Sequence, residues 1–373
     1  MERNSSDDVV NGTSISFPDL KHDIDIIVVY SVAYSLIFLF ALLGNLTVIA
    51  VVVRHRWMHT KTNFFIVNLA VADLLVALVV MPINTMINIF LDWRYGAVLC
   101  KLTPFLQGIS VCASVNTLAA IAIDRCLAIC YPLSYKITWR TCKIIMCGIW
   151  TFSVVLMIPY LVVYNLELYS SHPDLTYVCS PRWPSTTFET IYFLAGSLLF
   201  CYSIPLVLIT TCYCVIGYKV WHRKAPGVYG SNGIIHRSKI KVVKMLVVVV
   251  VLFAASWFPL WVIQIKMRMD PPSKDDFILF NYVIPICQWL GCANSSINPI
   301  VYSLFSKKIR TRIKTILMCK KAAYEIPRQL SSYASTRYVS VDYTNGHVTL
   351  RTNGLQKERK ASRTDRLFNN VYD

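Results

Sequence analysis

The stretch that decides the fold is residues 26–53, IIVVYSVAYSLIFLFALLGNLTVIAVVV, which contains no charged side chain. A helix of about 20 apolar residues is long enough to cross the hydrocarbon of a bilayer. In that environment every backbone N–H and C=O must be bonded within its own segment, which a helix achieves and an open sheet does not. The stretch therefore predicts a membrane-spanning helix.

Further runs of the same kind follow along the chain, and charge interrupts them only at Asp73. They cover residues 62–91, 102–123, 144–166, 190–218, 245–265 and 277–306. Charged residues make up 15% of the 373, whereas a soluble domain carries about a quarter. The runs also lack the polar–apolar alternation of barrel strands. We predict an all-α membrane protein with seven transmembrane helices in one bundle.

Positive charge is distributed unevenly between the connections. Those on one side of the predicted bundle, together with the C-terminal tail, carry 29 basic residues and six acids, against eight basic residues and 13 acids on the other side. Basic loops remain in the cytoplasm, so the N-terminus should lie outside and the tail inside. The net charge of +17 is then explained by orientation and by contact with anionic lipids. A nucleic-acid partner is not indicated.

This topology divides the chain into four predicted parts. Residues 1–25 form an extracellular N-terminus with glycosylation sequons at Asn4 and Asn11. Residues 26–306 form the bundle, 307–319 a short amphipathic helix on the membrane surface, and 320–373 a disordered cytoplasmic tail. Cys319 follows the amphipathic stretch and suits palmitoylation, although an unmodified thiol is the alternative.

Two of the 13 cysteines differ from the others, which are mostly scattered through apolar runs. Cys100 lies at the outer end of the third run and Cys179 in the outer loop before the fifth. Both face an oxidising compartment, where disulfides form and persist. A Cys100–Cys179 bridge is therefore expected.

Asp73 is the one acid deep inside a run, and an ionisable group at mid-bilayer is costly and usually functional. The polar residues Ser114, Asn294 and Ser295 lie at a similar depth in other runs. Together they predict a site for sodium, with no other cofactor. The alternative is a protonated Asp73 bonded to amides.

The cytoplasmic ends of two runs carry further signals. Asp124 and Arg125 could form a local ion pair that opens when a partner arrives, or could simply anchor the helix at the interface. Asn298 precedes Pro299, which lacks an N–H and leaves a carbonyl free. We expect the Asn298 side chain to bond that carbonyl and to stabilise a kink.

Taken in order, these residues resemble a rhodopsin-like G-protein-coupled receptor over about residues 26–319. The matching motifs are Gly44-Asn45, Leu69-Ala70-Val71-Ala72-Asp73, Cys100, Asp124-Arg125-Cys126, Trp150, Pro205, Trp257-Phe258-Pro259 and Asn298-Pro299 with Tyr302. Within that family the chain is similar to receptors for neuropeptide FF and related Arg-Phe-amide peptides. That similarity rests on Met58-His59-Thr60-Lys61-Thr62-Asn63, Gln107-Gly108-Ile109-Ser110-Val111, Arg182-Trp183-Pro184 and Ser256-Trp257-Phe258-Pro259-Leu260-Trp261.

The resemblance implies a plasma-membrane receptor, not an enzyme, that binds a C-terminally amidated peptide outside and a heterotrimeric G protein inside. Arrestin and receptor kinases would act on the tail. The implied ligand-binding residues are Gln107, Arg182, Glu189, Trp257, Leu260, Trp261, Gln264, Arg268 and Gln288. The implied switch residues are Asp124, Arg125, Tyr213, Lys239, Asn298, Pro299 and Tyr302. A transporter or channel is the competing class, but the two halves show no repeat.

The chain departs from this pattern in its charges. Receptors of the neuropeptide FF type carry acids near the positions of Arg182 and Arg268, and these acids pair with an arginine of the ligand. Lys239 also replaces an acid that is common in relatives, so no ion pair with Arg125 can form there. We hypothesise that the native peptide carries Asp or Glu near its C-terminus. The alternative is that Glu189 or another nearby acid still binds an arginine.

Overall fold

The computed structural model describes residues 20–131, 137–171, 174–222, 231–270, 276–305, 310–311, 339–344, 347–352 and 355–356. It divides into two compact units, Met1–Lys314 and Thr315–Asp373. Each unit is described by itself.

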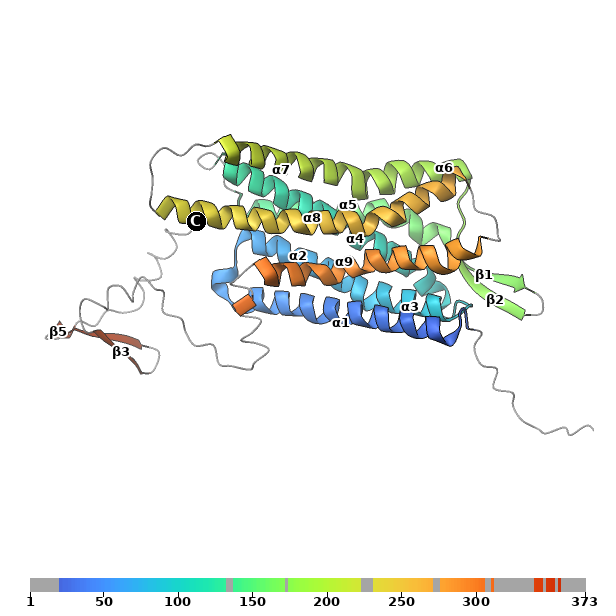
Figure 1. The fold of residues 1–373 in the computed structure, drawn as a ribbon, viewed down its shortest axis with the longest axis horizontal. Coiled ribbons are helices and arrows are strands. Elements are labelled where there is room, and N and C mark those ends of the chain that lie inside the picture. The colour runs from blue at the N-terminus through green and yellow to red at the C-terminus, as the bar shows by residue number, and fades with distance from the viewer. Residues whose placement is uncertain are drawn as a thin grey trace, which may run out of the picture. The chain divides into compact units, whose positions relative to one another are not determined.

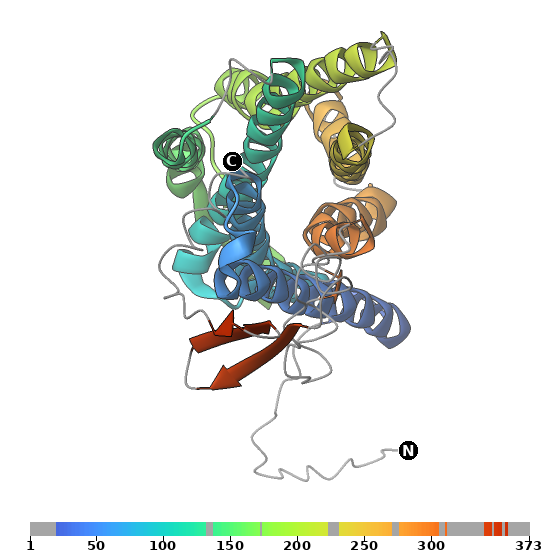
Figure 2. The same ribbon diagram turned by 90° about the vertical axis from the view of Figure 1, so that its left-hand side faces the viewer.

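The first unit is a bundle of long helices that run side by side, shown from the side in Figure 1 and end on in Figure 2. The α-helices are α1 (Ile24–Arg54), α2 (Lys61–Leu75), α3 (Met81–Ile89), α4 (Gly96–Cys130), α5 (Trp139–Val163), α6 (Thr186–Ile191), α7 (Ile204–His222), α8 (Ser231–Met269) and α9 (Ile284–Phe305). Among the described residues, six helical segments are long and apolar enough to cross a membrane, and α9 is a further long helix of the bundle. The predicted helical bundle is confirmed.

Three of the helical segments contain π-helical turns, over Val76–Val80, Tyr192–Ser203 and Leu279–Val283. Each turn ends two residues before a proline, namely Pro82, Pro205 and Pro285. In each case the residue just before the proline donates its N–H to the carbonyl five residues back. A proline lacks the N–H of the normal helical bond, so the π turns mark places where the ladder is rearranged while the segment continues.

A β-hairpin lies at one end of the bundle and projects beyond it (Figure 1). Its strands are β1 (Tyr164–Ser171) and β2 (Asp174–Pro181), which pair antiparallel. The predicted disulfide between Cys100 and Cys179 joins β2 to α4. Below, this end is called the hairpin end, and the end where α4 stops at Cys130 and α7 at His222 is called the far end.

The segment before α1 also lies at the hairpin end. Leu20 forms an isolated bridge with Phe90, and the Lys21 N–H bonds the Ile89 carbonyl at 2.9 Å. The His22 ring lies between two tyrosine rings, with centroids 5.7 Å from Tyr30 and 5.6 Å from Tyr282. The start of the chain's described part therefore connects α1, α3 and the turn before α9.

The contact between α1 and α9 depends on Gly44. A Cβ at this position would lie 2.8 Å from the Cβ of Pro299, closer than carbon atoms approach without strain. Only glycine lets the two backbones come this near. The close approach places the next residue, Asn45, within bonding distance of α9.

The second unit contains a three-stranded antiparallel sheet in the order β3 (Val339–Thr344), β4 (His347–Thr352), β5 (Leu355–Gln356). We expected no regular structure in this part of the chain. The sequence contains a signal for it, because Val339 to Tyr343 alternates apolar and polar side chains and an Asn-Gly pair follows at 345–346. Of the surface helix predicted over 307–319, only Arg310 and Thr311 are described, and both are helical.

Candidate ligand site and switch residues

The hairpin-end half of α8 presents one stripe of large side chains. Trp257, Trp261, Gln264 and Arg268 are spaced four, three and four residues apart, so they share a helix face. Trp261 packs against Phe193, with ring centroids 5.5 Å apart and the ring planes tilted by 44°. The stripe therefore faces the π-helical segment that precedes α7.

Trp257 marks the inner limit of this stripe and packs against α9. Its side chain is buried, and a Cβ at Gly291 would lie 2.9 Å from the nearest ring carbon. The indole N–H of Trp257 is buried and meets no acceptor within the described part of the chain, and the same holds for Trp261 and Trp289. Buried donors of this kind are costly when left unpaired, so they favour a ligand with acceptor groups.

Arg268 is fixed by contacts on several sides. It donates to the carbonyl oxygen of Gln264 at 2.9 Å and to its side-chain oxygen at 2.8 Å. The guanidinium carbon lies 3.8 Å from the centroid of the Phe193 ring. A further bond of 3.1 Å from Nη2 reaches Oε1 of Glu189. The positive charge predicted at this position is therefore already offset by an acid.

Arg182 is paired as well. It forms a two-bond ion pair with Glu167 across the hairpin, with Nη2 2.6 Å from Oε2. This bond holds the pKa of the Glu167 carboxyl below its usual range. Both arginines are thus paired with a glutamate of the receptor, an arrangement that the sequence alone did not show.

Asp73 is buried at the middle of the bundle, 1% exposed, and accepts a 2.9 Å bond from the Asn298 amide. The Ser295 side chain also contacts this carboxylate. Ser114 and Asn294 are buried too, and the Asn294 side-chain oxygen meets no donor within the described residues. A carboxylate, an amide oxygen and hydroxyls form the kind of oxygen-rich donor set that hard cations prefer, so the residues present fit sodium.

The carbonyl that Pro299 leaves without its helical N–H belongs to Ser295, four residues earlier. Its donor is Asn45, whose amide nitrogen bonds the Ser295 carbonyl at 3.0 Å and the Ala41 carbonyl at 2.8 Å. The expectation that Asn298 would serve this carbonyl is wrong, because its amide is turned to Asp73. A residue of α1 therefore stabilises the kink in α9.

At the far end, Asp124 and Arg125 form the predicted local ion pair. The neighbouring tether was not predicted: Lys219 of α7 donates to the carbonyl of Cys130, at the end of α4, and lies 4.8 Å from the centroid of the Tyr131 ring. A cation at a helix C-terminus is favourable because the last carbonyls lack donors. Lys219 thus holds the far ends of α4 and α7 together.

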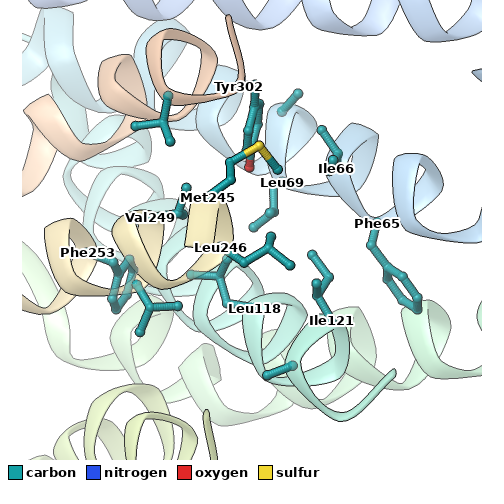
Figure 3. Packing of buried hydrophobic residues seen from close by; sticks show 14 of the residues in the cluster. Phe65, Ile66, Leu69, Leu118, Ile121, Met245, Leu246, Val249, Phe253 and Tyr302 are labelled. Atoms are coloured by element: carbon teal, nitrogen blue, oxygen red, sulfur yellow. The ribbon is translucent and has the colours of Figure 1, made fainter. Parts of the chain in front are cut away.

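A layer of apolar side chains packs together in the interior of the bundle (Figure 3). It combines Leu69 of α2, Ile121 of α4, Met245 and Leu246 of α8, and Tyr302 of α9. Ile121 lies one turn before Arg125 on the same helix face. The predicted switch residue Tyr302 belongs to this layer and is 1% exposed.

Known proteins that resemble this chain identify the family to which the arrangement belongs. The model of the 7 transmembrane receptor (rhodopsin family) matches residues 44–302. The chain belongs to the rhodopsin family of seven-transmembrane receptors. It is 37% identical to neuropeptide FF receptor 2 of Rattus norvegicus, over 78% of this chain and 72% of the relative. It is 35% identical to a QRFP-like peptide receptor of Branchiostoma floridae (78% and 77%) and 34% identical to neuropeptide Y receptor type 2 of Homo sapiens (83% and 81%).

The receptor is accordingly a multi-pass protein of the plasma membrane and not an enzyme. These comparisons confirm the predicted receptor class and give the transporter or channel alternative no support.

The other predicted residues remain predictions. Gln107, Leu260 and Gln288 are half-buried, and Tyr213 is a partly buried neighbour of the apolar layer. Lys239 lies in α8, but its side chain is outside the described part. Asn4, Asn11 and Cys319 also fall outside the described residues.

Sequence reasoning missed a hydrogen-bonded chain that joins three helices. The Trp150 indole of α5 donates to the Asn68 side chain at 2.7 Å, and Asn68 of α2 donates to the Thr117 hydroxyl of α4 at 2.8 Å. Asn68 and Thr117 are polar residues in apolar runs, and that placement was the available signal.

Proposed function

We propose that the receptor is activated by an extracellular peptide with an amidated C-terminus and transmits this signal to a heterotrimeric G protein. The hairpin end then lies outside and the far end inside, as the charge distribution indicates. The relatives named for neuropeptide FF, QRFP-like peptide and neuropeptide Y support a peptide ligand. Arrestin and receptor kinases are proposed partners of the phosphorylated tail.

The observation that carries this proposal is the set of unpaired donors in the hairpin-end half. The three indole N–H groups of Trp257, Trp261 and Trp289 are buried without an acceptor among the described residues. The hydroxyls of Thr103 and Ser110 are buried in the same part of the structure and meet no partner within the part of the chain that is described. A peptide end supplies several carbonyl oxygens, and a terminal amide adds one without introducing a charge that must be desolvated.

Signalling requires that the ligand bind one state of the bundle more tightly than another. We take the apolar layer around Tyr302 and the intact Asp124–Arg125 pair as features of the resting state. Opening the far end would separate Met245 and Leu246 from Tyr302 and expose Arg125 to the G protein. Pro259 lies between the two halves of α8, where the missing helix bond lets them move relative to each other.

The test is a screen of amidated peptides and their free-acid counterparts in a nucleotide-exchange assay on membranes that contain the receptor and a G protein. Amidated peptides should activate and the matched free acids should be at least tenfold weaker, because a carboxylate would have to enter a site built from neutral donors. Equal potency of the two forms would contradict the proposal. Epitope tags at the two termini, detected on intact and permeabilised cells, test the orientation.

The sodium site is proposed on the donor set around Asp73. Agonist affinity should be lower in sodium chloride than in N-methylglucamine chloride at equal ionic strength, and Asp73→Asn should remove the difference. An affinity that is the same in both salts would overturn this part of the proposal.

A further inference from the structure

The geometry of Arg268 carries an inference about the ligand, which rests on the proposed function. The Nη1 nitrogen of the guanidinium is fully used, since it donates to both oxygens of Gln264. The guanidinium carbon also lies over the Phe193 ring, 3.8 Å from its centroid. The side chain is 18% exposed. Arg268 is therefore a preorganised cation.

The edge of the guanidinium formed by Nε and Nη2 has a hydrogen-bond acceptor at only one of its two nitrogens. Its Nη2 bonds Oε1 of Glu189 at 3.1 Å, while Nε is buried and has no acceptor within the described residues. A carboxylate normally binds this edge through two parallel hydrogen bonds, one to each nitrogen. The present pair therefore leaves a buried donor unsatisfied, which is unfavourable.

Of the two side chains in this ion pair, Glu189 is the less firmly fixed by its surroundings. Its side chain is 31% exposed, more than that of Arg268, and it lies in the short helix α6. Exchange of Glu189 for another carboxylate would replace one bond by two, while Arg268 stays in place.

We propose that Arg268 is the subsite for an Asp or Glu side chain of the peptide, which displaces Glu189 and bonds both Nε and Nη2. Glu189 occupies the subsite in the resting receptor and so discriminates against peptides that lack an acid.

The position of the acid in the peptide follows from the length of α8. Arg268 lies two turns beyond Trp261 and three beyond Trp257, which is roughly 10–16 Å at about 1.5 Å per residue. An extended peptide covers about 3.3 Å per residue. If the amidated end lies between these two tryptophans, the acid is roughly three to five residues before it.

The experiment uses synthetic amidated nonapeptides that end in Phe-amide and carry Glu, Gln or Arg at the third, fourth or fifth residue from the end. At one of these positions, Glu should be more potent than Gln by about tenfold or more in the nucleotide-exchange assay, as for a hydrogen bond to a charged group. Arg268→Gln should abolish the preference for Glu over Gln. The matched control is Arg94→Gln, since Arg94 is also ion-paired, to Asp92, and stacked on Phe90, and it should retain the preference.

Glu189→Gln distinguishes this proposal from a purely structural role of the Arg268–Glu189 pair. It removes the competing carboxylate, so the Glu peptide should gain potency by several-fold. The reversed pair Glu189→Arg with Arg268→Glu should favour the Arg peptide. If Gln or Arg peptides match the Glu peptide on the unchanged receptor, or if Glu189→Gln weakens the Glu peptide, the subsite is wrong while the peptide-receptor function stands. If no amidated peptide of any kind activates the receptor, the proposed function itself is contradicted, and the subsite with it.

Discussion

The hydrogen bond from Asn45 to the Ser295 carbonyl gives a prediction whose size follows from the structure. In Asn45→Ala the carbonyl loses its donor at 3.0 Å, and Pro299 offers no N–H to replace it. An unsatisfied buried carbonyl costs about 1–3 kcal/mol. Asn116→Ala is the matched control, because Asn116 makes the same local bond to the carbonyl four residues back, at 2.9 Å. Asn45→Ala should destabilise the receptor by about 1–3 kcal/mol more than this control.

A double-mutant cycle isolates that bond from the cavity that alanine leaves. Pro299→Ala restores the backbone N–H at position 299, so the Ser295 carbonyl regains its helical partner. Removing Asn45 in this background should then cost about 1–2 kcal/mol less than in the unchanged receptor. Cavity terms are the same in both backgrounds and cancel in the coupling energy.

The assay is thermal unfolding of the purified receptor in detergent, followed with a thiol-reactive dye. Buried free cysteines such as Cys112, Cys201 and Cys292 become reactive as the bundle opens. Each kcal/mol should lower the midpoint by about 2–4 °C, the scale of soluble domains of comparable size. If Asn45→Ala and Pro299→Ala add within about 0.5 kcal/mol, the Ser295 carbonyl does not depend on Asn45 and the reasoning is refuted.

The remaining predictions concern other contacts of the bundle. Gly291→Ala should destabilise by about 1–3 kcal/mol, since its Cβ would lie 2.9 Å from the Trp257 ring, while Gly217→Ala, where a Cβ meets nothing within 4 Å, should not lower the unfolding midpoint. Lys219→Met should raise basal nucleotide exchange about two- to fivefold by releasing α7 from the end of α4, as expected for a contact of about 0.5–1 kcal/mol, and Lys219→Arg should preserve the basal level; equal exchange in both variants would argue against the tether. Burial and a neighbouring lysine lower the pKa of His22, so the folded segment favours the neutral ring. Its contribution to stability is present above the unfolded pKa of about 6.5 and is lost as the pH falls below it. Once the pH dependence of the intrinsic exchange rate is removed, the protection of amides near the start of α1 against hydrogen exchange should therefore fall in acid, and His22→Gln should make that protection less dependent on pH.

The parts of this receptor that could be predicted from sequence are those governed by the bilayer or by neighbours in the chain. The helices follow from uncharged runs, because unbonded backbone cannot lie in hydrocarbon. The Asp124–Arg125 pair follows from adjacency. The Cys100–Cys179 bridge follows from two cysteines on the same oxidising side.

The contacts that could not be predicted depend on how distant helices meet. Whether Asn298 or Asn45 serves the freed carbonyl depends on the register between α1 and α9, which Gly44 fixes by close approach. Likewise, Arg268 and Glu189 are 79 positions apart. The sequence shows the charges but not that each arginine has its own glutamate. Such pairing is a property of the assembled bundle.

The arrangement of α8 explains how these local contacts could act together. Its hairpin-end half carries Trp261 and Arg268, and its far-end half carries Met245 and Leu246 against Tyr302. Pro259 interrupts the helix between them. A ligand that replaces Glu189 changes the contacts of the first half only, so its binding energy shifts the second half only as far as the two halves are mechanically coupled. Since a shift from 1:99 to 99:1 needs about 5.5 kcal/mol of differential binding, the Arg268 subsite can contribute part of that energy, and contacts nearer Trp257 must supply the rest.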